Sequence, residues 1–200
     1  MTSLQQRDRT LADGLSYDEF VAAWDASLAA PLAGLTPEAR KYRLYAKYNR
    51  DRSTRVHAAY TPSEALRAAL AAAPPLTVLV LTEDWCGDSA FVLPVLADAF
   101  AADARHALRI LPRDAHLDVM DLHLTNGGRS IPKLVAFDAE GNEVFTWGPR
   151  SASGQAHRAT LVAEGLDYAA TSAKMVEWYE TGRWMDVEAE LVEHLAALSA

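Results

Sequence analysis

The chain has 200 residues, of which 50% are hydrophobic and 23% charged, and its net charge is −8. This composition is typical of a packed globular protein, excludes a largely disordered chain, and argues against nucleic acid as the main partner. The longest uncharged apolar stretches, such as 68–81, contain Pro74–Pro75 and are too short to cross a membrane. The polar start Met1–Thr10 lacks the apolar core of a secretory signal, so we expect a soluble cytoplasmic protein.

Three helices are predicted before Pro74–Pro75. Each begins at a capping signature, namely Ser16–Glu19, Thr36–Glu38 and Thr61–Glu64, followed by apolar residues at helical spacing. The first of these helices should end at Pro31. The first third of the chain is therefore expected to be helical.

The hydrophobic period changes after Pro74–Pro75. Leu76–Leu81 is a continuous apolar run of strand length, typical of a central strand buried on both faces. The elements predicted next are a helix over Gly87–Asp103, a strand over Leu108–Leu111, a helix over Asp114–Leu124, and an antiparallel hairpin of Leu134–Phe137 and Glu143–Trp147 around a five-residue loop. From Ala156 onwards we expect one long helix or two shorter ones, broken near Gly182.

The single cysteine, Cys86, stands where the first predicted strand leads into a helix. One cysteine excludes an intramolecular disulfide and a metal site of four cysteine ligands. The positive end of a helix favours a thiolate, whereas the nearby carboxylates of Glu83, Asp84 and Asp88 oppose it. We expect an exposed, reactive thiol that is less activated than in a strong oxidant.

Cys86 lies in the segment Trp85-Cys86-Gly87-Asp88-Ser89. This segment is similar to the Trp-Cys-Gly-Pro-Cys motif of thioredoxins, and its surroundings resemble the active site of the thioredoxin-like superfamily, in particular bacterial thioredoxin family proteins. Pro94 resembles the proline that kinks the active-site helix, Ile131-Pro132 resembles the loop with the cis-proline, and Gly148 matches a glycine near the site. The resemblance covers roughly residues 76–150.

Two departures from thioredoxins limit the chemistry. Ser89 replaces the resolving cysteine, so a dithiol cycle cannot close within the chain, and Val80 replaces the acid that thioredoxins bury. Cys-Gly-Asp-Ser also resembles the Cys-Gly-Phe-Ser site of monothiol glutaredoxins, which carry iron–sulfur clusters. The segment 146–150 lacks their glutathione loop, which leaves cluster carriage a minor hypothesis.

The resemblance implies an α/β fold, a thioredoxin-like central mixed sheet flanked by helices. We expect one compact unit with an N-terminal helical extension (1–75), a thioredoxin-like core (76–150) and C-terminal helices packed on it (151–200). The implied function is monothiol thiol-disulfide exchange. Cys86 is then catalytic and acts on protein or small-molecule disulfides, with Trp85, Gly87, Asp88, Ser89, Ile131, Pro132 and Gly148 as its neighbours.

No bound cofactor, metal or membrane partner is expected, although a low-molecular-weight thiol is the implied co-substrate. Two roles are open for Ser89: its hydroxyl donates to the thiolate, or it is only a small residue facing the first helical turn. Asp88 is interpreted as a charge at the helix N-terminus, and Pro132 as leaving the Ile131 backbone free for a substrate strand. The alternative function is a redox-inactive thioredoxin fold that binds peptides or assists folding.

Two further features are interpreted as structural. The basic segment Glu38–Arg55, with Tyr42, Tyr45 and Tyr48 on one face, is predicted to be a solvated amphipathic helix on an acidic body, although anion binding is an open alternative. The six histidines show no metal-ligand spacing and are expected at the surface or in caps.

Overall fold

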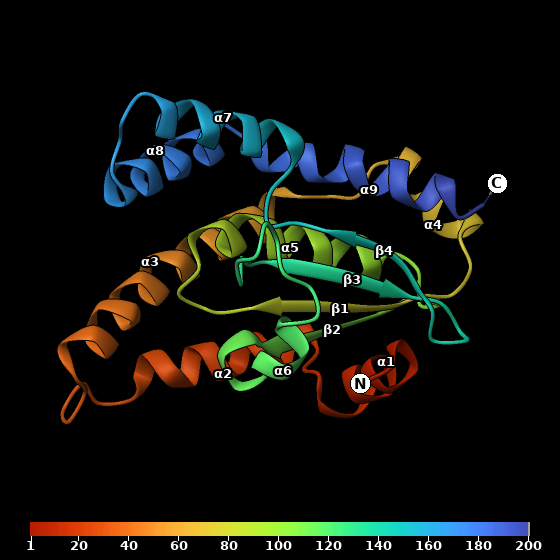
Figure 1. Cartoon of the computed structure of the whole chain (residues 1–200), viewed down its shortest axis with the longest axis horizontal. Coiled ribbons are helices and arrows are strands. Elements are labelled where there is room, and N and C mark those ends of the chain that lie inside the picture. The colour runs from red at the N-terminus through yellow and green to blue at the C-terminus, as the bar shows by residue number, and fades with distance from the viewer. Residues whose placement is uncertain (200) are drawn as a thin grey trace.

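A computed structural model describes residues 1–199 and shows one four-stranded sheet between helices (Figure 1). The strands are β1 (Thr77–Thr82), β2 (Ala107–Pro112), β3 (Lys133–Phe137) and β4 (Glu143–Trp147), in the order β2-β1-β3-β4. β1 is parallel to β2 and antiparallel to β3, and β4 pairs antiparallel with β3. The mixed sheet with flanking helices confirms the predicted α/β class.

Helices cover both faces of the sheet. They are α1 (Ser3–Asp13), α2 (Tyr17–Ala29), α3 (Pro37–Ala59), α4 (Glu64–Ala72), α5 (Gly87–Ala101), α6 (Leu117–Met120), α7 (Ala152–Ala163), α8 (Tyr168–Glu180) and α9 (Asp186–Ala197). In Figure 1, α1 and α6 lie below the sheet, α5 lies directly above it, and α7, α8 and α9 form an outer layer above α5. Within residues 1–199, no helix combines the length and apolar character needed to span a bilayer.

The hydrophobic interior has two parts, one on each side of the sheet. The larger cluster joins Val78, Val80 and Leu134 to the buried face of α5 and to the outer helices. The smaller cluster contains Leu79, Leu81, Val135 and Phe137 from the sheet, with Val119 and Met120 next to them. Cys86 belongs to the smaller cluster, so the sulfur lies at the edge of a packed core.

Most predicted elements are found, and three predictions were wrong. Four helices, rather than three, precede Pro74–Pro75, because the polar helix α1 has no apolar stripe and depends on a capping box between Thr2 and Gln5. The predicted helix Asp114–Leu124 is reduced to a 3-10 turn and the four-residue α6. The C-terminal region forms three helices, since the chain turns at Gly165 as well as near Gly182, both with positive φ.

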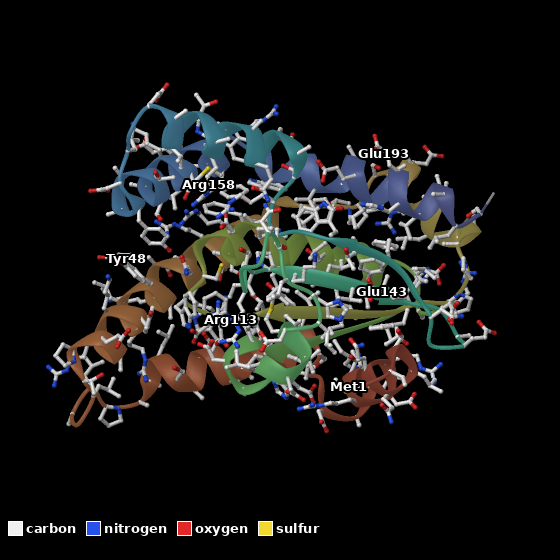
Figure 2. All side chains as sticks on the ribbon, in the orientation of Figure 1. Met1, Tyr48, Arg113, Glu143, Arg158 and Glu193 are labelled. Atoms are coloured by element: carbon white, nitrogen blue, oxygen red, sulfur yellow. The ribbon has the colours of Figure 1, made fainter. Side chains whose placement is uncertain are left out.

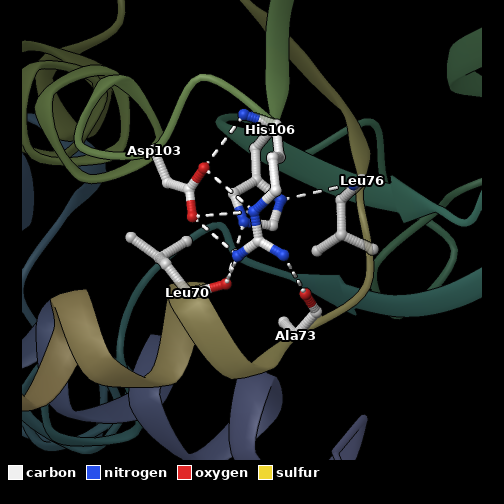
Figure 3. A network of polar contacts seen from close by, with 6 residues as sticks. Leu70, Ala73, Leu76, Asp103 and His106 are labelled. Carbon is white, nitrogen blue, oxygen red and sulfur yellow. Dashed lines mark hydrogen bonds and ion pairs between the residues drawn. The ribbon is translucent and has the colours of Figure 1, made fainter.

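A polar network joins the end of α4 to the start of the sheet, and Figure 3 shows it. The Arg105 guanidinium donates to the carbonyls of Leu70 (2.8 Å) and Ala73 (3.3 Å), and it is also paired with Asp103. His106 Nδ1 accepts from the Leu76 amide at 3.3 Å, which leaves Nε2 to donate to the Leu70 carbonyl at 3.2 Å. These bonds satisfy carbonyls at a helix end that has no intrahelical partners for them.

The expectation that the histidines lie at the surface or in caps is confirmed for His106, which binds the Leu70 carbonyl at the end of α4, and wrong for His123, which is buried against Gln6. His106 and His123 are each only 7% exposed, and burial lowers the pKa of both imidazoles. A neutral imidazole has one donor and one acceptor, which lets a buried histidine join two backbone or side-chain groups. The partners of a buried histidine depend on the folded structure, so no spacing pattern in the sequence predicts them.

Helix α3 confirms the predicted helix but not the role of its tyrosines. Its buried residues are the smaller side chains Ala46, Asn49, Ser53 and Val56. Tyr42, Tyr45 and Tyr48 are between 38% and 52% exposed. Small residues allow α3 to lie close to α5, and the tyrosines with the basic side chains cover its outer surface.

Candidate functional site

Cys86 occupies the turn between β1 and α5. β1 ends at Thr82, and Cys86 is the N-cap residue of α5, whose interior contains Pro94. The Cys86 thiol lies 3.4 Å from the carbonyl oxygen of Ile131, to which it can donate. The sequence-predicted residues Cys86, Ile131 and Pro132 are therefore brought together, although they are far apart along the chain.

The thiol is less accessible than the sequence suggested. We expected an exposed Cys86, whereas the residue is only 8% exposed, because the Ile131 segment lies against the sulfur and Trp85 packs beside it. Burial raises the pKa of the Cys86 thiol to about 11, and the nearby negative charge of Asp88 acts in the same direction. Hydrogen bonds from Ser89 and from the backbone of residues 88 and 89 lower that pKa, but by less. The resting thiol is protonated at neutral pH.

Trp85 is held in place on both sides. Its ring lies 4.9 Å from the Tyr42 ring of α3 and 5.0 Å from the Arg113 guanidinium. Figure 2 shows Arg113 close to α6, so contacts from two separate parts of the chain meet at Trp85. The half-buried indole thus links the N-terminal helices to the cysteine loop.

Pro132 directly precedes β3 and Gly148 directly follows β4, and the two residues lie against each other. The Ile131–Pro132 peptide bond is cis, and so is Gly148–Pro149. Gly148 has φ +105°, and a Cβ atom at this position would lie 2.3 Å from the Pro132 carbonyl oxygen. Only glycine fits such a close backbone approach.

Ser89 and Gly87 differ in how closely they are packed. The Ser89 hydroxyl is buried and accepts a hydrogen bond of 2.6 Å from Thr82 Oγ1, which leaves its own hydrogen available to Cys86. This arrangement supports the donor role rather than that of a merely small residue. No atom lies within 4 Å of a Cβ built on Gly87, so close packing does not require glycine there.

Asp88 has a partner that the sequence analysis missed. Its carboxylate forms a two-pronged ion pair with the Arg150 guanidinium, with Nε donating to Oδ1 at 2.8 Å and Nη2 to Oδ2. The side chains are only 13% and 17% exposed, respectively. Asp88 is therefore more than a charge at a helix end. Arg150 lies two residues after Gly148, but nothing local in the sequence pairs it with Asp88.

Two further carboxylates lie in the loop before Cys86. Burial raises the pKa of Glu83 to about 7, although its carboxylate accepts a 2.7 Å hydrogen bond from the Asp114 amide. Burial also raises the pKa of Asp84, whose backbone carbonyl accepts from Asn49 Nδ2 at 3.2 Å. The loop is thus held by α3 on one side and by the end of β2 on the other.

Comparison with known protein families decides the classification. A family model described as thioredoxin matches residues 36–162, which is more than half of the chain. The chain belongs to the thioredoxin family. The match extends beyond the sheet to α3, α4 and nearly all of α7, whereas α1, α2, α8 and α9 lie outside the matched region.

Two solved structures have the same fold as this thioredoxin-family chain. One is a protein of unknown function from Pseudomonas aeruginosa, with a TM-score of 0.55 and 17% identity over 92% of this chain and 98% of that chain. The other is an HIV epitope scaffold, with a TM-score of 0.54 and 17% identity over 92% of this chain and 99% of that chain. A search of curated proteins finds no significant match. At this identity the likeness concerns the fold alone.

A hollow of about 400 Å³ is lined by His57, Tyr60 and Asp98. It lies near the C-terminal end of α5, whereas Cys86 lies at the N-terminal end of that helix. Among residues 1–199, no group of three or more His, Cys, Asp or Glu side chains is arranged to hold a metal ion.

Proposed function

We propose that the protein is a monothiol thiol-disulfide exchange protein with Cys86 as its nucleophile. The observation that carries the proposal is the position of Cys86, at the N-terminus of α5 and in contact with the Ile131 carbonyl next to Pro132. In a thioredoxin fold, this position is where a thiol meets an extended substrate backbone. Membership of the thioredoxin family supports a role on disulfide substrates.

The reaction needs one protein thiol and one external thiol. The Cys86 thiolate attacks one sulfur of a disulfide, forms a mixed disulfide with that half, and releases the other half as a thiolate. An external thiolate then attacks the substrate sulfur of the mixed disulfide, forms a new disulfide, and returns Cys86 as a thiolate. Ser89 cannot perform the second step because a hydroxyl does not form a disulfide. We place this reaction in the cytoplasm, where small thiols are kept reduced.

The burial of Cys86 fixes the expected pH dependence. With the pKa of the thiol at about 11, only a small fraction is ionised at neutral pH, and the thiolate fraction rises about tenfold per pH unit. Exchange should therefore accelerate from pH 7 to pH 10 more steeply than for a thiol with an ordinary pKa.

The test is reduction of a glutathionylated peptide with glutathione as the external thiol. Wild type should accelerate the release of the peptide thiol above the rate with glutathione alone, and Cys86→Ser should abolish the acceleration. Ser89→Ala is the comparison variant, because it keeps the nucleophile and removes only a hydroxyl that can donate to the thiolate, so it should slow the reaction without abolishing it. Equal rates for wild type and Cys86→Ser would overturn the proposal, and a native Cys86 that iodoacetamide cannot alkylate would leave a binding module as the remaining function.

A further inference from the structure

A buried polar cluster surrounds the N-terminal turn of α5 on the side of the C-terminal helices. It consists of Asp88, the Arg150 guanidinium that pairs with it, and the Tyr179 side chain of α8. Tyr179 is 2% exposed, and its ring is stacked on Phe91 of α5 with a centroid distance of 4.8 Å and 11° between the planes. A tyrosine from α8 is thus fixed against the same helix that begins at Cys86.

The Tyr179 hydroxyl is buried beside the Asp88 carboxylate. Its oxygen is one of two buried side-chain oxygens without a hydrogen-bond partner in residues 1–199. Burial, and then the charge of Asp88, raise the pKa of Tyr179 far above its ordinary value, so the hydroxyl keeps its proton. An unmade hydrogen bond in the interior is costly, and such groups are often found at functional sites.

Cys86 is within electrostatic reach of both cluster members that can stabilise an anion. Cys86 is the N-cap residue of α5, Asp88 with its partner Arg150 lies two residues further along, and Tyr179 stacks on Phe91 in the next turn of the same helix. A charge on Cys86 raises the pKa of both Arg150 and Tyr179, in agreement with this placement. By reciprocity, the Arg150 cation stabilises a thiolate at Cys86, and the Asp88 carboxylate opposes it. In the resting protein Arg150 offsets part of the effect of Asp88 on the thiol, and the charge of Asp88 still opposes ionisation of Cys86.

We propose that Asp88, Arg150 and Tyr179 are positioning residues that set how readily Cys86 ionises: Asp88 keeps the thiol protonated, and Arg150 with the Tyr179 hydroxyl stabilises the thiolate. The inference rests on the proposed function of Cys86. The thiolate is needed twice in exchange, as the attacking group in the first step and as the leaving group in the second. Groups that stabilise the thiolate therefore speed both its formation before the attack and its departure from the mixed disulfide.

Three further charged groups, outside the cluster, lie around the site. Glu83 and Asp84 lie in the loop before Cys86, and Glu83 is hydrogen-bonded to the Asp114 amide. Arg158 of α7 lies near enough to Asp88 to lower the pKa of that carboxyl. These groups remain unchanged in the variants below, so a difference between the variants reports on the cluster.

The test measures the rate of iodoacetamide alkylation of Cys86 from pH 6 to pH 12 in the full chain. Asp88→Asn keeps the shape of the side chain and removes its charge, so the midpoint should fall by about one pH unit and the rate at pH 8 should rise about tenfold. Tyr179→Phe keeps the stacking on Phe91 and removes only the hydroxyl, so the midpoint should rise and the rate at pH 8 should fall about threefold.

Two matched controls separate the cluster from general effects of the substitutions. Asp25→Asn breaks a two-pronged pair with Arg50 that resembles the Asp88–Arg150 pair but belongs to α2 and α3. Tyr168→Phe removes a hydroxyl from the same helix α8, where Tyr168 is 80% exposed. Both controls should leave the alkylation midpoint at its wild-type value.

The outcomes distinguish this inference from the proposed function. If Cys86 is alkylated with the same midpoint in wild type and Tyr179→Phe, the positioning role is wrong, whatever the exchange activity. If the midpoints shift as expected but no variant reduces a glutathionylated peptide, the proposed function is wrong and the electrostatic role stands. If Asp88→Asn unfolds, as judged by circular dichroism, the comparison of Tyr179→Phe with Tyr168→Phe decides.

Discussion

Single buried groups give this protein two opposing pH dependences of stability. His123 lies under α1, where its Nε2 donates to Gln6 Oε1 at 2.6 Å and its Nδ1 lies 3.6 Å from Glu143. Burial, and then the charge of Lys133, lower the pKa of His123 to about 4. Glu83, beside the cysteine loop, has its pKa raised to about 7 by burial. Each group is neutral over a wider pH range in the folded state than in the unfolded chain.

For His123, the unfolded chain takes up a proton before the folded protein does. Its contribution to stability is complete above the unfolded pKa of about 6.5 and is lost as the pH falls through about 4. We expect the free energy of unfolding of wild type to fall by about 2 kcal/mol more than that of His123→Gln between pH 7 and pH 4. Urea unfolding at a series of pH values measures this difference. Parallel curves for the two proteins would contradict it.

For Glu83, the sign is opposite. The folded protein holds the proton up to about pH 7, whereas the unfolded chain releases it near 4.5, so wild type loses stability as the pH rises between these values. Glu83→Gln keeps an oxygen to accept from the Asp114 amide and removes the charge. Its free energy of unfolding relative to wild type should rise by about 2 kcal/mol from pH 5 to pH 8. A constant difference in urea unfolding across this range would show that Glu83 is not buried as described.

At the scale of elements, α3 secures the cysteine loop. Asn49 is 2% exposed, donates to the Asp84 carbonyl, and accepts from Arg52 at 3.0 Å. Tyr42, about two turns earlier, contacts Trp85. An element outside the sheet therefore controls how firmly the residues before Cys86 are held.

Removal of the Asn49 amide should loosen this loop. Asn49→Ala leaves the Asp84 carbonyl without its donor, so we expect a loss of about 1 to 3 kcal/mol in the free energy of unfolding and faster alkylation of Cys86 at fixed pH. Tyr45→Ala on the exposed side of α3 is the control and should change neither quantity by much. Thermal unfolding and alkylation followed by mass spectrometry provide the two measurements.

The sequence predicted those elements whose signals lie within a few neighbouring residues. Ser16 and Thr36 are capping residues at the starts of α2 and α3, and Asp138–Asn142 forms the loop of the predicted hairpin. The partners of Asp88 could not be predicted in the same way, because Arg150 reaches it across 62 residues and only the fold brings them together. Burial of Cys86 likewise depends on Ile131, whose distance from the sulfur is set by the sheet register.

At the scale of the whole molecule, α1 covers the face of the sheet that carries the smaller core cluster. Its Leu4 packs against Gly141 of the β3–β4 turn, and its Arg7 donates to the Ala139 carbonyl. The sheet residues on this face, Leu79, Val135 and Phe137 among them, are fully buried. The N-terminal helix therefore helps to cover the hydrophobic core on this face of the sheet.

Deletion of residues 2–13 should therefore expose part of an apolar sheet face. Each large apolar side chain that becomes exposed costs about 1.5 to 3 kcal/mol, so the free energy of unfolding should fall by at least about 3 kcal/mol. Binding of the dye ANS should increase in the truncated protein, since it reports exposed apolar surface. Unchanged stability with no added dye binding would mean that α6 alone seals this face.

Because Cys86 is buried, the rate at which it is labelled can report how often the site opens. The chain has one thiol, and Ile131 and Trp85 must move before a reagent reaches it. At saturating reagent, the labelling rate no longer depends on reagent concentration and equals the rate of local opening at the site. The unmodified protein can thus report the timing of its own local opening without an introduced probe.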